Sequence, residues 1–474
     1  MAEAYQCAPS VTDVAAFVDE QPIGRFQIRL LLACAAVLLL DGFDTQGIGY
    51  VAPALAHDWN LARGGLGPVF SAGLLGNMVG ALLFGPLADR IGRKRIIVLS
   101  TAAFGLGTLA TVFAPDIAGL LFIRFLTGLG LGAALPNAIA LVSEFSPDRR
   151  RATMVMAMFV GFSVGSALSG LIAAVLIPTF GWRSVFLIGA IAPILLVPFL
   201  AARLPESVRF LALSGRADVR VAELLTQVAP SVRFPSAMRF RVREATLVGL
   251  PIAHLFNGGR ALATLVLWAV FFMSLLDLYL LLNWLPTVLN DLGASVSVAA
   301  VVGAMLQVGG IVGTLTLGRF IDRFSFRALS LVFLIAAIAI AIVGFSGQSI
   351  AFAIFAISCA GFFLVGGHIA AIALAATYYP TMARSTGVGW AIGVGRIGSI
   401  VGPLIGGIML ARGVDAQSLF VAAAVPALVA SVAALGLARM APSTSATVSS
   451  TQAVAAAPPT DAGAIFNKRS GLRF

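Results

Sequence analysis

Long apolar runs recur along almost the whole chain and are separated only by short charged connections. Breaks at glycine, proline and charged residues divide them into spans near residues 27–50, 66–87, 95–114, 117–141, 152–177, 184–203, 261–289, 297–317, 328–346, 350–378, 385–411 and 417–438. A helix needs ~20 mainly apolar residues to cross a bilayer, whereas barrel strands would alternate with a period of two. The pattern therefore predicts an all-α membrane protein with about twelve transmembrane helices.

The composition excludes several other classes of protein. Only 11% of the residues are charged, against roughly 25% in soluble domains, which argues against a soluble enzyme. The net charge of +11 comes from basic clusters at the ends of apolar runs, so we expect no nucleic-acid partner. Cys7, Cys34 and Cys359 are far apart and lack metal-ligand spacing. No Ser-His-acid arrangement or phosphate-binding loop stands out, and we expect no enzyme activity, metal or cofactor.

The basic residues also predict an orientation in the membrane. Arginine and lysine concentrate in alternate connections, at 90–95, 149–151, 204–260 and 319–327, while the intervening connections carry almost none. By the positive-inside rule the basic connections and both termini are cytoplasmic. Acidic residues near the start of the chain argue against a cleavable signal peptide.

These features divide the chain into five predicted segments. A cytoplasmic N-terminal segment (1–25) precedes a six-helix half (26–203), a cytoplasmic linker (204–260) and a second six-helix half (261–438). The last part, 439–474, is rich in Ala, Ser, Thr and Pro without periodicity, which is typical of a disordered tail.

The two halves match each other at one constant offset, as the repeats of transporters do. The positions in register are Gly85 and Gly318, Asp89 and Asp322, Arg151 and Arg384, Asp44 and Asp277, and Pro53 and Pro286. At two pairs of equivalent positions the residues differ, because Asp41 corresponds to Ser274 and Arg124 corresponds to Ile357. We therefore predict two pseudo-symmetric halves in which an acid and a base of the first half have no counterpart in the second.

Several motifs resemble a known transporter family. GPLADRIGRKR, from Gly85 to Arg95, resembles the loop between the second and third helices of the major facilitator superfamily. LDGFDTQGIGYVAPAL, LPESVRFL, LLNWLPTVLNDLG and GVGWAIGVGRIGSIVGPLIGG are similar to the aromatic acid/proton symporter family within it. The resemblance implies the major facilitator fold and import of a benzoate-type or hydroxybenzoate-type carboxylate with protons, through the inner membrane of a bacterium. We expect a monomeric functional unit.

Asp41 and Asp44 are the candidates for proton coupling. Their spacing puts both carboxyl groups on one face of an apolar helix, where an acid is costly unless it faces a cavity or a partner. The alternative is a hydrogen-bonded pair that fixes helix packing. Asp277 is expected to face the same cavity from the second half, with a packing or gating role as an alternative.

Arg124 lies in an otherwise apolar span beside Gly128, Gly130 and Gly132, which allow close helix approach. Its guanidinium can bind a substrate carboxylate through two parallel hydrogen bonds. The alternative is an ion pair with Asp41 or Asp44 that never touches the substrate. Arg124 has both roles if its guanidinium alternates between a carboxylate of the protein and the carboxylate of the substrate.

Further substrate-binding candidates are the aromatic and polar side chains Phe43, Asn137, Asn283, Trp284, His368, Trp390 and Arg396, because an aromatic acid needs apolar walls with a few polar anchors. In many relatives a glutamine stands where this chain has His368. The resemblance therefore leaves the exact substrate open.

The charged loop residues predict a gate rather than a binding site. Gly85 permits tight packing, and Asp89 can pair with Arg149 or Arg384 when the inner side is shut. Glu144 is expected to join the arginines at 149–151. The full set of gating candidates is Gly85, Asp89, Gly92, Arg93, Glu144, Asp322 and Arg384.

Two other functions fit an apolar chain of this kind. One is export of drugs or aromatic compounds by a relative in the same superfamily, although exporters tend to carry a Gly-Pro pattern in the fifth helix and GFSVGSALSG has no proline. The other is a membrane sensor that binds aromatic acids without net transport. Labelled uptake into vesicles separates the three.

Overall fold

The structure, a computed structural model, describes residues 11–62, 64–213, 218–232, 234–235, 238–241, 253–256, 259–345, 349–379 and 384–440. In these ranges twelve helices are long and apolar enough to cross a membrane. In the first half they are α2 (Arg25–Asp58), α3 (Gly67–Ile91), α4 (Arg93–Val112), α5 (Ile117–Glu144), α6 (Asp148–Phe180) and α7 (Arg183–Arg203). In the second half they are α11 (Ala261–Asp291), α12 (Val296–Thr316), α13 (Gly318–Val343), α14 (Ile350–Tyr378), α15 (Arg384–Ala411) and α16 (Ala416–Met440).

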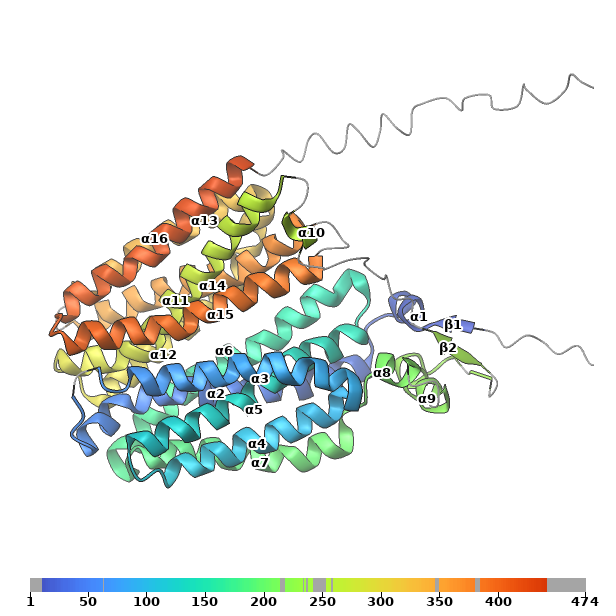
Figure 1. Ribbon diagram of the computed structural model, residues 1–474, viewed down its shortest axis with the longest axis horizontal. Helices are drawn as coiled ribbons and strands as arrows, with labels where there is room; N and C mark the ends of the chain where they lie inside the picture. Colours follow the sequence, from blue (N-terminus) through green and yellow to red (C-terminus); the bar gives the residue numbers. More distant parts are fainter. Residues whose placement is uncertain are drawn as a thin grey trace, which may run out of the picture.

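The two sets of six helices form two bundles that lie side by side, with the first half below the second in Figure 1. The predicted fold class is confirmed by this arrangement. Glycines allow the close packing within each bundle. A Cβ atom on Gly128 or Gly132 of α5 would collide with the backbone carbonyls of Gly73 or Asn77 on α3.

The loop after the second helix of each half bends the backbone at corresponding positions of the repeat. Gly92, between α3 and α4, has a φ of 102°, and Ser325, within α13, has a φ of 53° and a ψ of −132°. Glycine adopts positive φ without cost, whereas serine is strained there. The break at Ser325 also explains why α13 begins at Gly318, ten residues before the predicted span near 328–346.

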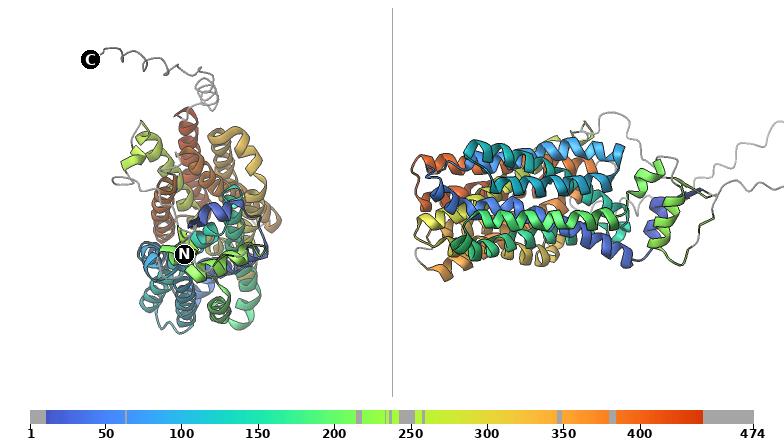
Figure 2. Two further views of the ribbon diagram at one scale, coloured as in Figure 1. Left: turned by 90° about the vertical axis from the view of Figure 1, so that its right-hand side faces the viewer. Right: turned by 90° about the horizontal axis from the view of Figure 1, so that it is seen from below.

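A small extramembrane unit covers one end of the first half. It consists of β1 (Val11–Asp13), α1 (Val14–Glu20), α8 (Val208–Leu213), α9 (Asp218–Val228) and β2 (Arg239–Arg241), seen at the right of Figure 1 and in Figure 2. The short α10 (Ala253–Phe256) precedes α11. β1 and β2 pair in parallel, with Val11 opposite Arg239. Two short strands therefore accompany the predicted all-helical fold.

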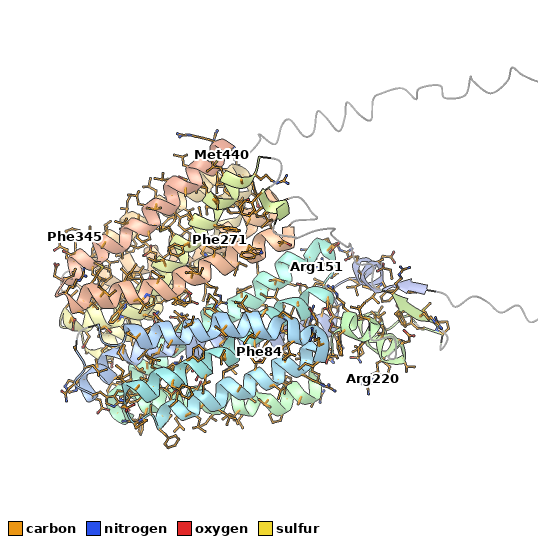
Figure 3. The ribbon with its side chains drawn as sticks, viewed as in Figure 1. Phe84, Arg151, Arg220, Phe271, Phe345 and Met440 are labelled. Atoms are coloured by element: carbon orange, nitrogen blue, oxygen red, sulfur yellow. The ribbon has the colours of Figure 1, made fainter. Side chains whose placement is uncertain are left out.

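We call the end that carries this unit the linker end, and the other end the closed end. In Figure 3, Arg151 and Arg220 lie at the linker end and Phe345 lies at the closed end. The last helix, α16, continues to Met440, two residues into the predicted tail. The rest of that tail, 441–474, lies outside the described residues.

The two halves touch each other closely toward the closed end. The hydroxyl of Ser71 donates to the Ile400 carbonyl over 2.8 Å, and that of Ser297 donates to the Ala174 carbonyl over 2.7 Å. Gly64 has a φ of 81°, and a Cβ atom there would collide with the Gly407 carbonyl. These contacts hold the two halves directly against each other toward the closed end.

Candidate functional site

A cavity of about 150 Å³ lies between the halves and draws its lining from both. Its wall is mainly apolar, formed by Leu135, Ile139, Phe159, Phe162, Leu275, Leu278, Val365, Ile369, Ile372 and Ile392. Its polar members are Asp41, Thr45, Asn77, Ser163, Tyr279, Gln307, His368 and Arg396. An apolar cavity of roughly 150 Å³ accepts one benzene ring. The space therefore suits a single aromatic ring with a few polar substituents.

Asp41 and Arg396 face each other across this cavity from different halves. Asp41 is 2% exposed and accepts a hydrogen bond from the Thr45 hydroxyl over 3.0 Å. Arg396, on α15, donates to the amide oxygen of Asn77 on α3 and lies near enough to Asp41 for their charges to interact. The predicted sites Asp41, His368 and Arg396 are thus brought together.

Arg124 is placed differently, in a buried ion pair with Asp44. Its guanidinium donates to both carboxylate oxygens of Asp44, over 3.1 and 2.9 Å, and its side chain is 3% exposed. Thr108 donates to the same carboxylate over 2.6 Å. Arg124 does not line the cavity, so of the two roles considered for it this conformation has the ion pair.

Asp277 occupies the matching place in the second half without these partners. It is 0% exposed, and neither carboxyl oxygen has a hydrogen-bond partner among the described residues. At the positions that correspond to Arg124 and Thr108 stand Ile357 and Ala341. Contrary to expectation, Asp277 does not line the cavity.

Five other substrate-binding candidates also lie outside the cavity lining. The ring of Phe43 packs against Gly189, and the Asn137 amide donates to the Ala133 carbonyl over 2.8 Å. Three further side chains are engaged elsewhere: Asn283 donates to the Tyr279 carbonyl, Trp284 donates to the Pro403 carbonyl, and Trp390, which is 46% exposed, stacks on Trp268. In each case a partner within the same half holds the side chain away from the cavity.

Comparison with known proteins settles the family. The model of the Major Facilitator Superfamily matches residues 34–269 and 267–470. The chain belongs to this superfamily. Solved structures share the fold: the xylose transporter XylE from E. coli has a TM-score of 0.68 at 17% identity, covering 89% of this chain and 99% of that one. A bacterial homologue of human Spinster has a TM-score of 0.66 at 18% identity, covering 89% and 98%.

Relatives within the superfamily confirm the resemblance to aromatic acid transporters. The 4-hydroxybenzoate transporter PcaK of Pseudomonas aeruginosa is 42% identical, over 89% of this chain and 95% of that protein. The gallate transporter of Pseudomonas putida is 40% identical, over 89% and 94%. The 3-(3-hydroxy-phenyl)propionate transporter of Escherichia coli is 39% identical, over 85% and 93%. The protein is therefore a multi-pass membrane transporter rather than an enzyme.

The superfamily loop motif lies at the linker end, in a charge network of the first half. Arg93 binds Glu144 over 2.8 Å and Asp89 over 3.4 Å. Ser207 donates to the second carboxylate oxygen of Glu144 over 2.6 Å. A Cβ atom on Gly92 would collide with the Glu206 carboxylate, which accepts from the Lys94 backbone N–H over 3.0 Å. The φ of 102° therefore favours glycine at position 92, and a larger residue would also displace the Glu206 carboxylate.

Three contacts expected of the gate residues are not formed in this conformation. Arg149 binds the backbone carbonyls of Asp19 and Gln21 in the N-terminal segment rather than Asp89. Glu144 pairs with Arg93 rather than with the arginines at 149–151. Nothing lies within 4 Å of a Cβ atom on Gly85, so the close packing predicted there is absent from this conformation. Asp322 is exposed, and the side chain of Arg384 lies outside the described parts.

Sequence reasoning missed five polar residues of the cavity, namely Thr45, Asn77, Ser163, Tyr279 and Gln307. Asn77 and Gln307 are single amides within apolar helices, and both are buried. A polar side chain in the middle of a transmembrane span is itself a functional signal. If amide side chains are counted in the same way as charged ones, this criterion identifies both Asn77 and Gln307 as candidates.

Proposed function

We propose that this transporter imports an aromatic carboxylate of benzoate or hydroxybenzoate type together with protons, by alternating access. The observation that carries the proposal is Arg396, a cation in the wall of a cavity that is otherwise mainly apolar and large enough for one ring. In the described part of the chain Arg396 bonds to the Asn77 amide and has no carboxylate partner. A guanidinium in this setting can bind a substrate carboxylate in two-bond geometry.

Asp41 is the proton carrier in this proposal. Asp44 is engaged by two hydrogen bonds from Arg124, whereas Asp41 has only the Thr45 hydroxyl and the more distant Arg396. A substrate carboxylate that takes up the charge of Arg396 leaves Asp41 without its nearest cation. Substrate binding then favours protonation of Asp41, which couples the two events.

The basic connections support a direction for the transport cycle. By the positive-inside rule the linker end is cytoplasmic, and the contacts at Ser71, Ser297 and Gly64 close the opposite side. We assign this conformation to the inward-facing state, in the inner membrane of a bacterium, with a monomer as the functional unit. The names of the relatives support the aromatic substrate.

Uptake of labelled 4-hydroxybenzoate into proteoliposomes with an imposed pH gradient tests the proposal. We expect accumulation when the interior is alkaline, and its loss in Asp41→Asn, with exchange of labelled for unlabelled substrate retained. Arg396→Lys should weaken binding at least tenfold, because an ammonium cannot form the planar two-bond contact. Arg412→Lys, at an exposed position of the closed end, is the matched control.

The alternatives give different outcomes in the same assay. An exporter moves label only with the pH gradient reversed, and a sensor binds label without moving it. If Asp41→Asn still accumulates substrate against a gradient, Asp41 is not the proton carrier.

A further inference from the structure

A histidine and a serine form a fixed pair in the wall of the cavity. His368 of α14 lines the cavity, and its Nδ1 atom lies 2.9 Å from the hydroxyl oxygen of Ser274 on α11. The same hydroxyl lies 3.2 Å from the backbone carbonyl of Phe271, and the Phe271 ring packs edge-on against the imidazole at 5.6 Å. Ser274 is 0% exposed and stands where the first half has Asp41.

The protons of this pair can be assigned from the number of hydrogen bonds that each arrangement makes. A carbonyl oxygen can only accept, and a serine hydroxyl has one proton to donate. If Ser274 donates to Phe271, it can accept from an Nδ1–H group, and both short contacts are hydrogen bonds. If Ser274 donates to Nδ1 instead, the contact with Phe271 is lost. The first arrangement satisfies more of the buried groups.

This assignment leaves the other ring nitrogen as an acceptor. With the proton on Nδ1, the neutral imidazole carries its lone pair on Nε2. Among the described residues Nε2 has no hydrogen-bond partner, and no carboxylate pairs with His368 to favour a charged ring. A neutral ring is also the form that burial favours. The cavity wall therefore offers a bare acceptor at this point.

A second unpaired acceptor belongs to another residue of the cavity lining. Gln307 of α12 is 2% exposed, and its Oε1 atom is buried without a hydrogen-bond partner in the described part of the chain. An acceptor left unpaired in a buried site costs free energy until a donor reaches it. His368 Nε2 and Gln307 Oε1 lie on neighbouring helices of one half, and a ligand with hydrogen-bond donors would satisfy both acceptors.

We propose that His368 Nε2, held in its accepting tautomer by Ser274, and Gln307 Oε1 bind hydroxyl groups on the aromatic ring of the substrate. The inference rests on the proposed function and refines it, because it assigns the recognition of ring substituents to residues that carry no charge. The carboxylate lies on Arg396, and the hydroxyl donates to the second half. The site thus selects hydroxylated aromatic acids over their unsubstituted or O-methylated counterparts, which have no proton to donate.

A matched series of ligands tests the selectivity of the native protein. Dissociation constants are measured on the purified full chain for benzoate, 4-methoxybenzoate and 2-, 3- and 4-hydroxybenzoate. We expect at least one hydroxybenzoate isomer to bind roughly tenfold to hundredfold more tightly than benzoate, and the methoxy analogue to bind no better than benzoate. The preferred isomer then indicates the direction of the acceptors from Arg396.

Two variants test whether the preference for hydroxylated acids depends on His368 and Ser274. His368→Phe keeps an aromatic ring against Phe271 and removes both nitrogens, and Ser274→Ala removes the group that fixes the tautomer. Both should reduce the preference for the hydroxylated acid toward unity, because each should weaken binding of the hydroxylated acid by a larger factor than binding of benzoate. Ser330→Ala is the control, because Ser330 is also a buried, hydrogen-bonded serine of the second half but lies against Ser431, away from the cavity.

The results separate this inference from the proposed function. Equal binding of benzoate and all three hydroxybenzoates by the native protein overturns the hydroxyl site while leaving aromatic acid transport intact. The inference also fails if the variants weaken benzoate and hydroxybenzoate by the same factor, because the pair then only supports the fold. If the native protein binds none of these acids, the proposed function itself is wrong.

Discussion

Replacing Arg124 decides between a structural ion pair and a substrate anchor. Isoleucine is the informative replacement, because Ile357 stands at the corresponding position of the second half. Asp44 is 2% exposed in the native protein. In Arg124→Ile its carboxyl group loses two hydrogen bonds and the neighbouring positive charge, and keeps only the hydrogen bond from Thr108. Removing one partner of a buried ion pair costs about 3 to 5 kcal/mol.

The double variant isolates the pair. Asp44→Asn together with Arg124→Ile leaves no charge at either of these two positions, and the amide oxygen can still accept from Thr108. We expect the double variant to recover most of the stability, with a coupling free energy of about 2 to 3 kcal/mol between the two sites. Asp277 has no hydrogen-bond partner among the described residues, and Ile357 stands at the position that corresponds to Arg124, so the second half accommodates a buried acid without that base.

Thermal unfolding of the purified protein measures the effect, and binding of 4-hydroxybenzoate is measured on the same samples. A loss of 3 to 5 kcal/mol corresponds to a fall in Tm of roughly 10 °C for a unit of this size. If the destabilisation of the double variant equals the sum of those of Arg124→Ile and Asp44→Asn measured singly, the coupling free energy is zero and the ion pair does not stabilise the fold. Unchanged stability with abolished binding in Arg124→Ile would make Arg124 the anchor instead of Arg396.

Three further substitutions test other parts of the structure. Asp277→Asn replaces a buried acid by a neutral group of the same shape, so we expect normal uptake and an unchanged Tm; loss of pH-driven uptake would make Asp277 part of the proton path. Gly64→Ala puts a methyl group against the Gly407 carbonyl at a positive φ, so the closed end should not seal; normal uptake would contradict that closure. Ser325→Gly removes a strained φ of 53° and should stabilise the protein by about 1 kcal/mol, seen as a higher Tm; a lower Tm would show that Ser325 is not strained.

The long apolar runs were sufficient to predict the helices and their number, because crossing a bilayer requires a length that few other structures need. They were not sufficient to predict which side of each helix faces the cavity. Phe43, Asn137 and Trp390 lie in helices that carry only a few polar residues, too few to form a stripe that marks the inner face. Asp41, His368 and Arg396 were found because a charged or titratable side chain in such a helix has few stable places other than the cavity.

Two other features depend on information that the sequence pattern does not carry. Asp41 and Asp44 lie one helical turn apart, and the partner of Arg124 depends on how α5 is rotated against α2, which periodicity does not determine. The strands β1 and β2 are three residues long, too short for a recognisable alternation. Their pairing is a tertiary contact between segments that are distant in the chain, and no local sequence pattern predicts it.

That pairing has a consequence for how the chain is made. Thr12 in β1 contacts Met238, next to β2, across 226 positions of sequence. A ribosome adds about 5 to 20 residues per second, so β1 waits on the order of ten seconds or more for its partner. When β2 emerges, all six helices of the first half have been synthesised and none of the second half has. Once residue 241 has been added, the first half therefore possesses every described segment that covers its linker end.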